Sequence, residues 1–157
     1  MANTQALCSA FKLDLLNGYH SFSNTCPART INTADTYKAA IYLASATVDA
    51  TTTAYSATGE VGNSGTYSAG GPTVTWVAPA KTAGTSANAS STTYTTLSAS
   101  ISVSSFSATA FDAVLIYNST NNKAVSVHTF GSQTIASGTF TLTMPTNDQT
   151  TGLIRIT

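Results

Sequence analysis

Charged side chains are scarce in this chain: Asp, Glu, Lys and Arg make up 8% of its 157 residues, and six bases balance six acids. Soluble domains carry about 25% charged residues on average. A neutral surface does not create the positive field that attracts nucleic acid or an anionic membrane, so we expect neither as a partner. It also gives little repulsion between copies, which favours self-association.

Long apolar runs and a secretory leader are also missing. No stretch approaches the ~20 consecutive apolar residues that cross a bilayer. Residues 1–22 contain neither a basic region followed by a continuous apolar segment nor a small-residue cleavage site. We therefore expect the protein to be made in a reducing cytoplasm, where its two cysteines, Cys8 and Cys26, are free thiols.

The glycine-rich stretch at residues 60–71 lacks the residues that a phosphate-binding loop needs. Gly65 and Gly70 have the required spacing, but Gly71 and Pro72 stand where Lys and Ser or Thr should follow. Glycine adopts positive φ angles without steric cost. The stretch is therefore predicted to form turns or bulges between strands.

The side chains that could act as ligands or bases are dispersed along the chain. Cys8, His20 and Cys26 lack the local spacing of a zinc site, and no Gly-x-Ser-x-Gly motif marks a nucleophilic serine. His20 follows the predicted helix, and His128 is predicted to point outward beside Ser126. The six carboxylates include no close pair in sequence. We therefore expect no enzyme activity, no cofactor and no metal.

One helix is predicted close to the N-terminus. Asn3 or Thr4 is a suitable cap, and Gly18 is a suitable end. Apolar side chains recur at every fourth position, at Leu7, Phe11 and Leu15. Residues 20–35 show no periodicity, so residues 1–35 are predicted to be a helix with a connector arm. The apolar stripe must pack on the protein's own sheet or on a neighbouring subunit.

From residue 36 onward, apolar and polar residues alternate with the period of a strand. The predicted strands are residues 36–46, 73–77, 97–103, 111–118, 124–130, 139–144 and 152–157. The polar turn NSTNN makes residues 111–130 a hairpin, whereas residues 78–96 are predicted to be a loop with at most one edge strand. Residues 36–157 therefore predict an antiparallel β-sandwich of jelly-roll or Greek-key type, in an all-β chain with one short α-helix.

Three stretches together resemble a family of small structural proteins of tailed-phage virions. They are YKAAIYLASATVDATTTAYSATGEVGNSGTYSAGGPTVT, FDAVLIYNSTNNKAVSVHTFG and SGTFTLTMPTNDQTTGLIRIT. The resemblance implies a non-enzymatic virion component. Through its similarity to jelly-roll cement proteins of podovirus heads, it also implies a place on the capsid exterior, with the major capsid protein as partner.

We therefore expect a capsid decoration, or cement, protein that stabilises the shell across capsomer contacts and associates into dimers or trimers. The interface candidates lie on the predicted helix and in the glycine-rich stretch: Leu7, Phe11, Leu15, Gly62, Gly65, Tyr67, Gly70 and Gly71. The alternative is a tail-fibre or receptor-binding module in which Trp76 and Tyr94 stack on a glycan. Alternation of Trp76 with Val74 favours a core position for Trp76 instead.

Overall fold

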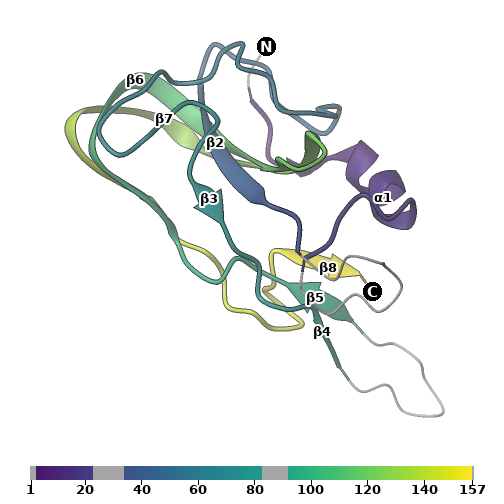
Figure 1. The fold of residues 1–157 in the computed structure, drawn as a ribbon. Coiled ribbons are helices and arrows are strands. Elements are labelled where there is room, and N and C mark those ends of the chain that lie inside the picture. Colours follow the sequence, from purple (N-terminus) through teal and green to yellow (C-terminus); the bar gives the residue numbers. More distant parts are fainter. Residues whose placement is uncertain (1–2, 23–33, 83–91, 157) are drawn as a thin grey trace.

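The computed structural model describes residues 3–22, 34–82 and 92–156 of the chain. These residues form two antiparallel sheets and one short helix (Figure 1), which confirms the all-β prediction. The helix α1 spans Ser9–Leu16. The strands are β1 (Ala6–Leu7), β2 (Tyr37–Leu43), β3 (Thr73–Val74), β4 (Ala80–Lys81), β5 (Thr93–Thr95), β6 (Ile101–Asn118), β7 (Lys123–Leu142) and β8 (Ile154–Ile156).

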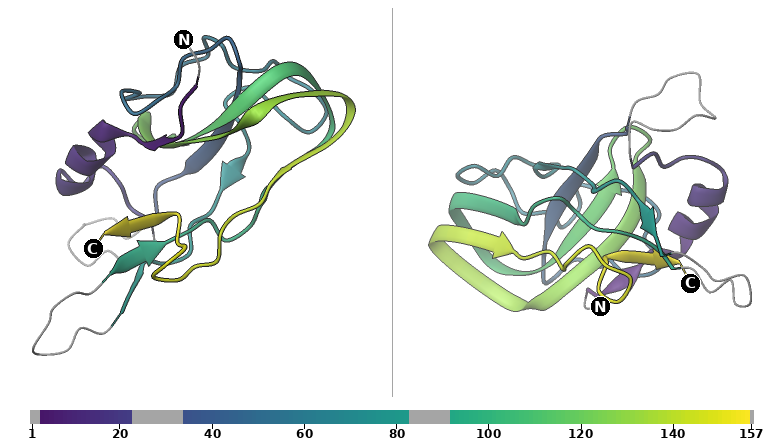
Figure 2. Two further views of the ribbon diagram at one scale, coloured as in Figure 1. Left: turned by 180° about the vertical axis from the view of Figure 1, so that it is seen from behind. Right: turned by 90° about the horizontal axis from the view of Figure 1, so that it is seen from below.

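The described strands divide into a sheet of five, in the order β1-β7-β6-β2-β3, and a sheet of three, in the order β4-β5-β8. A long ribbon of β6 and β7 curves around one side of the molecule, and the smaller sheet lies next to α1 on the other (Figures 1 and 2). Two antiparallel sheets fit a β-sandwich. This strand order does not establish jelly-roll connectivity, which stays a prediction.

Strands β6 and β7 are each longer than predicted. Residues 97–103 and 111–118 were expected as two strands, but one ladder runs from Asn118, opposite Lys123, to Ile101, opposite Leu142. The prediction was wrong because serine, alanine and glycine between the apolar runs resemble turns. They form bulges instead: the register shifts repeatedly, and Ser105 and Ala110 have positive φ angles of 52° and 50°. Residues 124–130 and 139–144 join into β7 in the same way.

Four phenylalanines from the bent part of this ribbon pack together. Ring centroids lie 5.4 Å apart for Phe106 and Phe111, 5.2 Å for Phe111 and Phe140, and 5.1 Å for Phe130 and Phe140. Such pairs add about 1 kcal/mol each to the burial of their surface. The cluster therefore supports the bend between the irregular parts of the ladder.

Strand β2 is the central strand that the sequence predicted. It pairs with β6 over its whole length, from Tyr37 opposite Asn118 to Leu43 opposite Phe111, and with β3 on its other side. Its middle residues are buried on both faces. The predicted hairpin at residues 111–130 is also confirmed, because β6 and β7 meet across the NSTNN turn.

The N-terminal segment begins with a strand rather than with the predicted helix. Leu7 pairs with Ser126 of β7, and the N–H of Cys8 donates to the carbonyl of Val125 at 3.0 Å, so the helix starts only at Ser9. Asn3 does not cap the helix; its side chain accepts from the Val48 N–H at 2.9 Å. The edge of β7 therefore pairs with the residues around Leu7 as a strand, although helical periodicity had placed them in the first turn of the helix.

The C-terminal end of α1 is as predicted. Gly18 has a positive φ of 73°. The Gly18 N–H donates to the Leu15 carbonyl at 3.1 Å, and the Tyr19 N–H donates to the Asp14 carbonyl at 2.9 Å. These two bonds are those of a Schellman motif, which satisfies carbonyls that the helix itself leaves free.

The glycine-rich stretch is built around one carboxylate. Tyr55 donates its hydroxyl to Oε2 of Glu60, and the hydroxyl of Tyr67 and the N–H of Gly70 donate to Oε1, all at 2.6 Å. Burial, together with the bond to Glu60, raises the pKa of both tyrosines. The stretch forms turns that lead into β3, which confirms the prediction of turns between strands.

Residues 78–96 contain two short strands, β4 and β5, where at most one was predicted. β5 pairs on its other side with β8, so the smaller sheet depends on the C-terminal strand, which sequence reasoning had not connected with this loop. The remaining part of the loop, residues 83–91, lies outside the described residues. So does most of the predicted connector arm, residues 23–33, with Cys26.

We expect Gly71→Ala to lower the free energy of unfolding by about 3 kcal/mol or more. Gly71 has a φ of 77°, and an added Cβ would lie 1.9 Å from the carbonyl oxygen of Ala39 in β2. Gly62→Ala is the matched control, because an added Cβ there meets no atom within 4 Å. Urea unfolding followed by circular dichroism measures both; equal stabilities would contradict this placement of the stretch.

Candidate interaction surface

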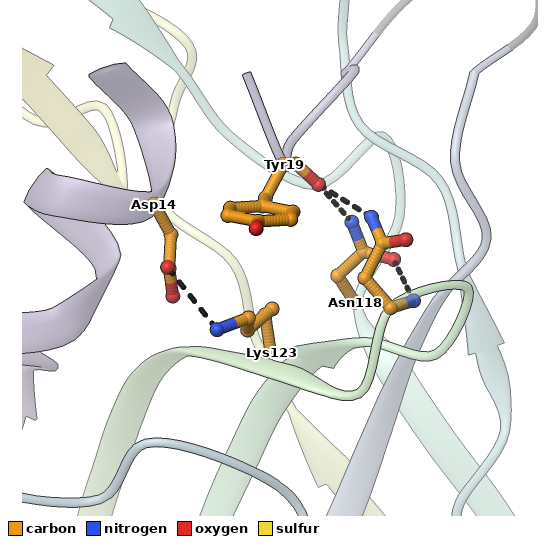
Figure 3. Close-up of polar contacts among 5 residues, drawn as sticks. Asp14, Tyr19, Asn118 and Lys123 are labelled. Atoms are coloured by element: carbon orange, nitrogen blue, oxygen red, sulfur yellow. Dashed lines mark hydrogen bonds and ion pairs between the residues drawn. The ribbon is translucent and has the colours of Figure 1, made fainter. Parts of the chain in front are cut away.

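Helix α1 is held against the β6–β7 turn by an ion pair and a cation–π contact (Figure 3). Nζ of Lys123 lies 3.3 Å from Oδ1 of Asp14 and 4.9 Å from the ring centroid of Tyr19. The Asp14 side chain is 7% exposed, whereas that of Lys123 is 33% exposed. The Asp14 carboxylate thus faces the sheet.

The asparagines of the turn fix the chain directly after the helix. Asn118 and Asn121 donate their side-chain amides to the carbonyl of Tyr19 at 2.9 and 2.7 Å (Figure 3). Asn118 is fully buried, and it also donates to Asp35, which accepts from the Ser21 N–H at 2.7 Å. The sequence predicted a polar turn here but did not connect it with the N-terminal segment. Its run of asparagines, each with two amide donors, was the signal for this anchoring role.

An apolar groove separates α1 from the smaller sheet. Its volume is about 140 Å³. It is lined on the N-terminal side by Phe11, Leu15 and Phe22, and on the side of the smaller sheet chiefly by Pro79, Tyr94, Ile154 and Ile156. The groove thus joins the predicted helical stripe to the C-terminal strand.

Large apolar side chains are exposed on α1 and β8, beside this groove. Leu16 is 87% exposed, Leu13 62% and Ile156 51%. We call these three residues the apolar patch. Lys12 and Arg155, on the same two elements, are also exposed. Large exposed apolar side chains can form part of an interaction site in a soluble protein.

The predicted interface residues occupy other positions. Leu7 lies in β1 and is partly buried, Phe11 is 1% exposed, and Leu15 packs against the core, so the predicted stripe faces the protein's own interior. Tyr67 is also 1% exposed. Sequence reasoning missed Leu13 and Leu16, because a helix that starts at Ser9 and is fixed through Asp14 turns those leucines outward.

Most of the glycines that were predicted to form an interface have a role in the packing or hydrogen bonding of the fold itself. Gly65 would place a Cβ 2.2 Å from the Ser104 carbonyl oxygen, and Gly71 abuts Ala39 of β2. Gly70 bonds Glu60 through its N–H and accepts from the Tyr117 hydroxyl at 2.8 Å. Gly62 meets open space. An interface role for these residues stays a prediction.

Trp76 is a core residue, as its alternation with Val74 indicated. It is 5% exposed, and its ring meets Phe22 and Tyr37 edge to face at centroid distances of 4.9 and 5.8 Å. Tyr94 lies instead in the apolar groove. The two aromatic residues of the glycan-stacking alternative therefore do not share an exposed face.

Each of the six carboxylates has a structural partner. They are Asp14, Asp35, Asp49, Glu60, Asp112 and Asp148, and they bind the backbone, a hydroxyl, an amide or Lys123. Hydrogen bonds from threonine hydroxyls and backbone amides lower the pKa of Asp49 and Asp148. Within residues 3–22, 34–82 and 92–156, no group of three or more His, Cys, Asp or Glu side chains is placed to hold a metal ion.

His128 does not point into solvent, so this prediction was wrong. The residue is half-buried, its Nε2 lies 2.9 Å from the Ser126 hydroxyl, and Ser126 is itself buried. Thr143, Met144 and Leu153, which follow β7 in the chain, line an open pocket of about 310 Å³ together with His128. Burial lowers the pKa of His128 to about 4.

The other histidine and the described cysteine are also buried. His20 packs on Phe11 at a centroid distance of 4.9 Å, and its Nδ1 lies 3.4 Å from the Tyr37 hydroxyl. Cys8 is a free thiol with no exposed surface. Burial raises its pKa to about 11, so the reactive thiolate is suppressed.

Comparisons of the chain with protein-family models, with curated proteins and with solved structures found no match. In the part of the chain that the structure describes, no helix has the length and apolar character needed to cross a membrane.

We expect Lys123→Met to lower the free energy of unfolding by roughly 2 kcal/mol, because it leaves the Asp14 carboxylate buried without its cation. Asp14→Asn in the same variant should restore part of the loss, since an amide costs less to bury. Lys12→Met, at an exposed position of α1, is the matched control and should change little. Urea unfolding measures all three, and equal losses at Lys12 and Lys123 would refute the assigned ion pair.

We expect the free energy of unfolding to fall as the pH drops from about 6.5 to about 4. In this window the imidazole of His128 takes up a proton in the unfolded chain, whereas in the folded chain it stays neutral. Protonation therefore favours unfolding. The variant His128→Asn should show a flatter dependence across the same window. Urea unfolding at several pH values provides the measurement, and parallel curves for both proteins would rule out His128 as the source.

Proposed function

We propose that this chain is a capsid decoration protein that binds the exterior of a tailed-phage head. The observation that carries the proposal is the apolar patch: Leu13 and Leu16 are exposed on a helix that the Asp14–Lys123 pair fixes to the sheet, and Ile156 is exposed on β8. The sequence resemblance to small virion structural proteins supports the same function. The partner at the patch would be the major capsid protein.

Decoration needs a subunit that binds the assembled shell more tightly than free capsid subunits. Such a ligand stabilises the assembled state by mass action. The low charge of the chain suits this task, because a neutral surface can dock on a dense protein lattice without long-range repulsion. Its carboxylates are engaged within the fold, so hydroxyls and the apolar patch dominate what a partner meets.

The apolar patch alone is smaller than a stable interface. Three exposed side chains cover less than the ~800 Å² per partner that specific complexes bury. Additional contacts from the surrounding surface, or several linked copies, would have to supply the remaining affinity. A role on a lattice with many equivalent sites fits this size better than a role as a free one-to-one ligand.

The alternative of a glycan-binding tail module has less support. It depended on stacking by Trp76 and Tyr94, and Trp76 is 5% exposed and packed against two aromatic rings. Tyr94 remains available in the groove. Binding on a glycan array that is lost on Tyr94→Ala would favour this alternative.

We expect Leu13→Ser with Leu16→Ser to weaken binding to purified heads of the encoding phage by roughly tenfold or more, since each leucine loses burial worth about 1.5 kcal/mol or more. Lys12→Ser changes the same helix without removing apolar surface and is the control. Sedimentation with heads measures the bound fraction. Point variants are preferable to deletion of the helix, because Cys8 and Phe11 belong to the core.

Electron microscopy of heads with labelled protein locates the binding site independently of affinity. Label on the capsid exterior is the expected result. Label confined to the tail, or full occupancy by the double variant, would contradict the proposed function.

A further inference from the structure

Strand β7 forms the outer border of the curved ribbon, with β6 inside it (Figure 2). The first part of that border is covered. Leu7 of β1 pairs with Ser126, the Cys8 N–H donates to the Val125 carbonyl, and the Ala124 N–H donates to the carbonyl of Thr53. Backbone pairing of β1 and the adjacent residues with β7 ends at this part of the strand.

The border from Thr129 to Leu142 is open in the described part of the molecule. Within residues 3–22, 34–82 and 92–156, no backbone group outside β6 is hydrogen-bonded to the backbone of this segment. The opposite border of the ribbon differs. There the glycine-rich stretch covers β6, where the Thr66 N–H donates to the Ser104 carbonyl at 3.0 Å and the Ser107 N–H donates to the Ser64 hydroxyl at 2.7 Å.

The open border also lacks the residues that usually protect a sheet edge. Natural proteins place charges, prolines or very short strands at edges to prevent pairing with other chains. Here no Asp, Glu, Lys or Arg occurs between Lys123 and Asp148, and no proline occurs in that interval before Pro145. An uncharged open edge of this length indicates that the edge is paired in the functional state.

The segment Gly138–Leu142 is the part of this edge with a regular course. Phe140, Thr141 and Leu142 pair in register with consecutive residues of β6. The next paired residues are Val103 with Phe140 and Phe106 with Gly138. These pairs are three residues apart on β6 but two apart on β7, so the extra residue of the bulge lies on β6. Before Gly138 the register shifts within β7 itself. Only a regular stretch offers evenly spaced donors and acceptors to a partner strand.

We infer that the outer edge of Gly138–Leu142 pairs antiparallel with the same edge of a second copy of this chain. A two-fold axis through the segment would pair the backbone donors and acceptors of both edges with each other. No edge of this segment would remain for a third copy, so the assembly would be a closed dimer. The absence of charge on the edge removes the like-charge repulsion that would oppose self-pairing. The segment TFTL, with β-branched and aromatic residues, has the composition that favours strands.

The side chains fit such a pairing on both faces of the sheet. Thr139 and Thr141 are exposed, and in the dimer they would lie opposite threonines of the other copy, where hydroxyls can bond across the strands. Phe140 and Leu142 point to the other face, where Phe140 is already buried. The dimer therefore extends the larger sheet without exposing apolar side chains. This inference does not rest on the proposed function.

Analytical ultracentrifugation of the full chain over a range of concentrations tests the inference. The wild type should reach twice the 16.1 kDa mass of one chain and no more. Thr139→Lys with Thr141→Lys places like charges across the two-fold axis and should raise the dimer dissociation constant by roughly tenfold or more. A wild type that stays monomeric, or that forms a trimer, would overturn the inference.

Ser102→Lys with Ser104→Lys is the matched control. Both serines are exposed, and they lie on the same face one strand further from the axis, since Ser102 pairs with Thr141 within the subunit. This variant should dimerise like the wild type, and circular dichroism should show that both variants fold. A β7 variant that dimerises unchanged, or that loses no more affinity than the control, would refute the interface.

Amide hydrogen exchange gives a second readout that needs no substitution. Peptides that contain residues 138–142 should exchange more slowly at high than at low protein concentration, because dimerisation would protect their outward N–H groups. Exchange that is independent of concentration in these peptides, in a sample that dimerises, would assign the dimer to another surface and overturn the inference.

Discussion

The long antiparallel ladder between β6 and β7 is the constraint on which the rest of the structure depends. β2 pairs with one side of this ribbon, β1 with the other, and the turn between the two strands anchors the N-terminal segment through Asn118 and Lys123. Backbone hydrogen bonds impose this arrangement, because every buried N–H and C=O needs a partner. The bulges interrupt the ladder locally and let the ribbon bend, and the phenylalanine cluster packs within the bend.

A chain with few charges can use its carboxylates within its own fold. Glu60 organises the glycine-rich stretch, Asp14 orients the helix, and Asp35 links Ser21 to the β6–β7 turn. Hydrogen bonds to charged groups are stronger than those between neutral groups, so a small number of carboxylates can fix long loops. The described surface is rich in hydroxyls and carries few charges. Contacts with other molecules must then come from apolar side chains and from backbone edges.

The sequence predicted the features that depend on local periodicity or on turn chemistry. β2, the NSTNN hairpin and the end of α1 at Gly18 follow from a few neighbouring residues. The errors occurred where a partner distant in sequence decided the outcome. β7 pairs with Leu7 as a strand, irregular pairing carries β6 through Ser105, and residues after β7 lie beside His128. The outward leucines of α1 were missed for the same reason, since the packing of Asp14 sets the helix face.

The apolar patch and the β7 edge carry separate proposals. Together, dimerisation through β7 would strengthen binding through the patch. One patch of three side chains offers too little area for lasting attachment to a shell. A dimer through β7 carries two patches, and once one is bound, the second binds at an effective concentration set by the fixed geometry of the dimer. Pairing of backbone edges would thus raise avidity without adding contacts to either patch. A neutral subunit with a small patch can in this way hold to a lattice whose sites repeat at a matching distance.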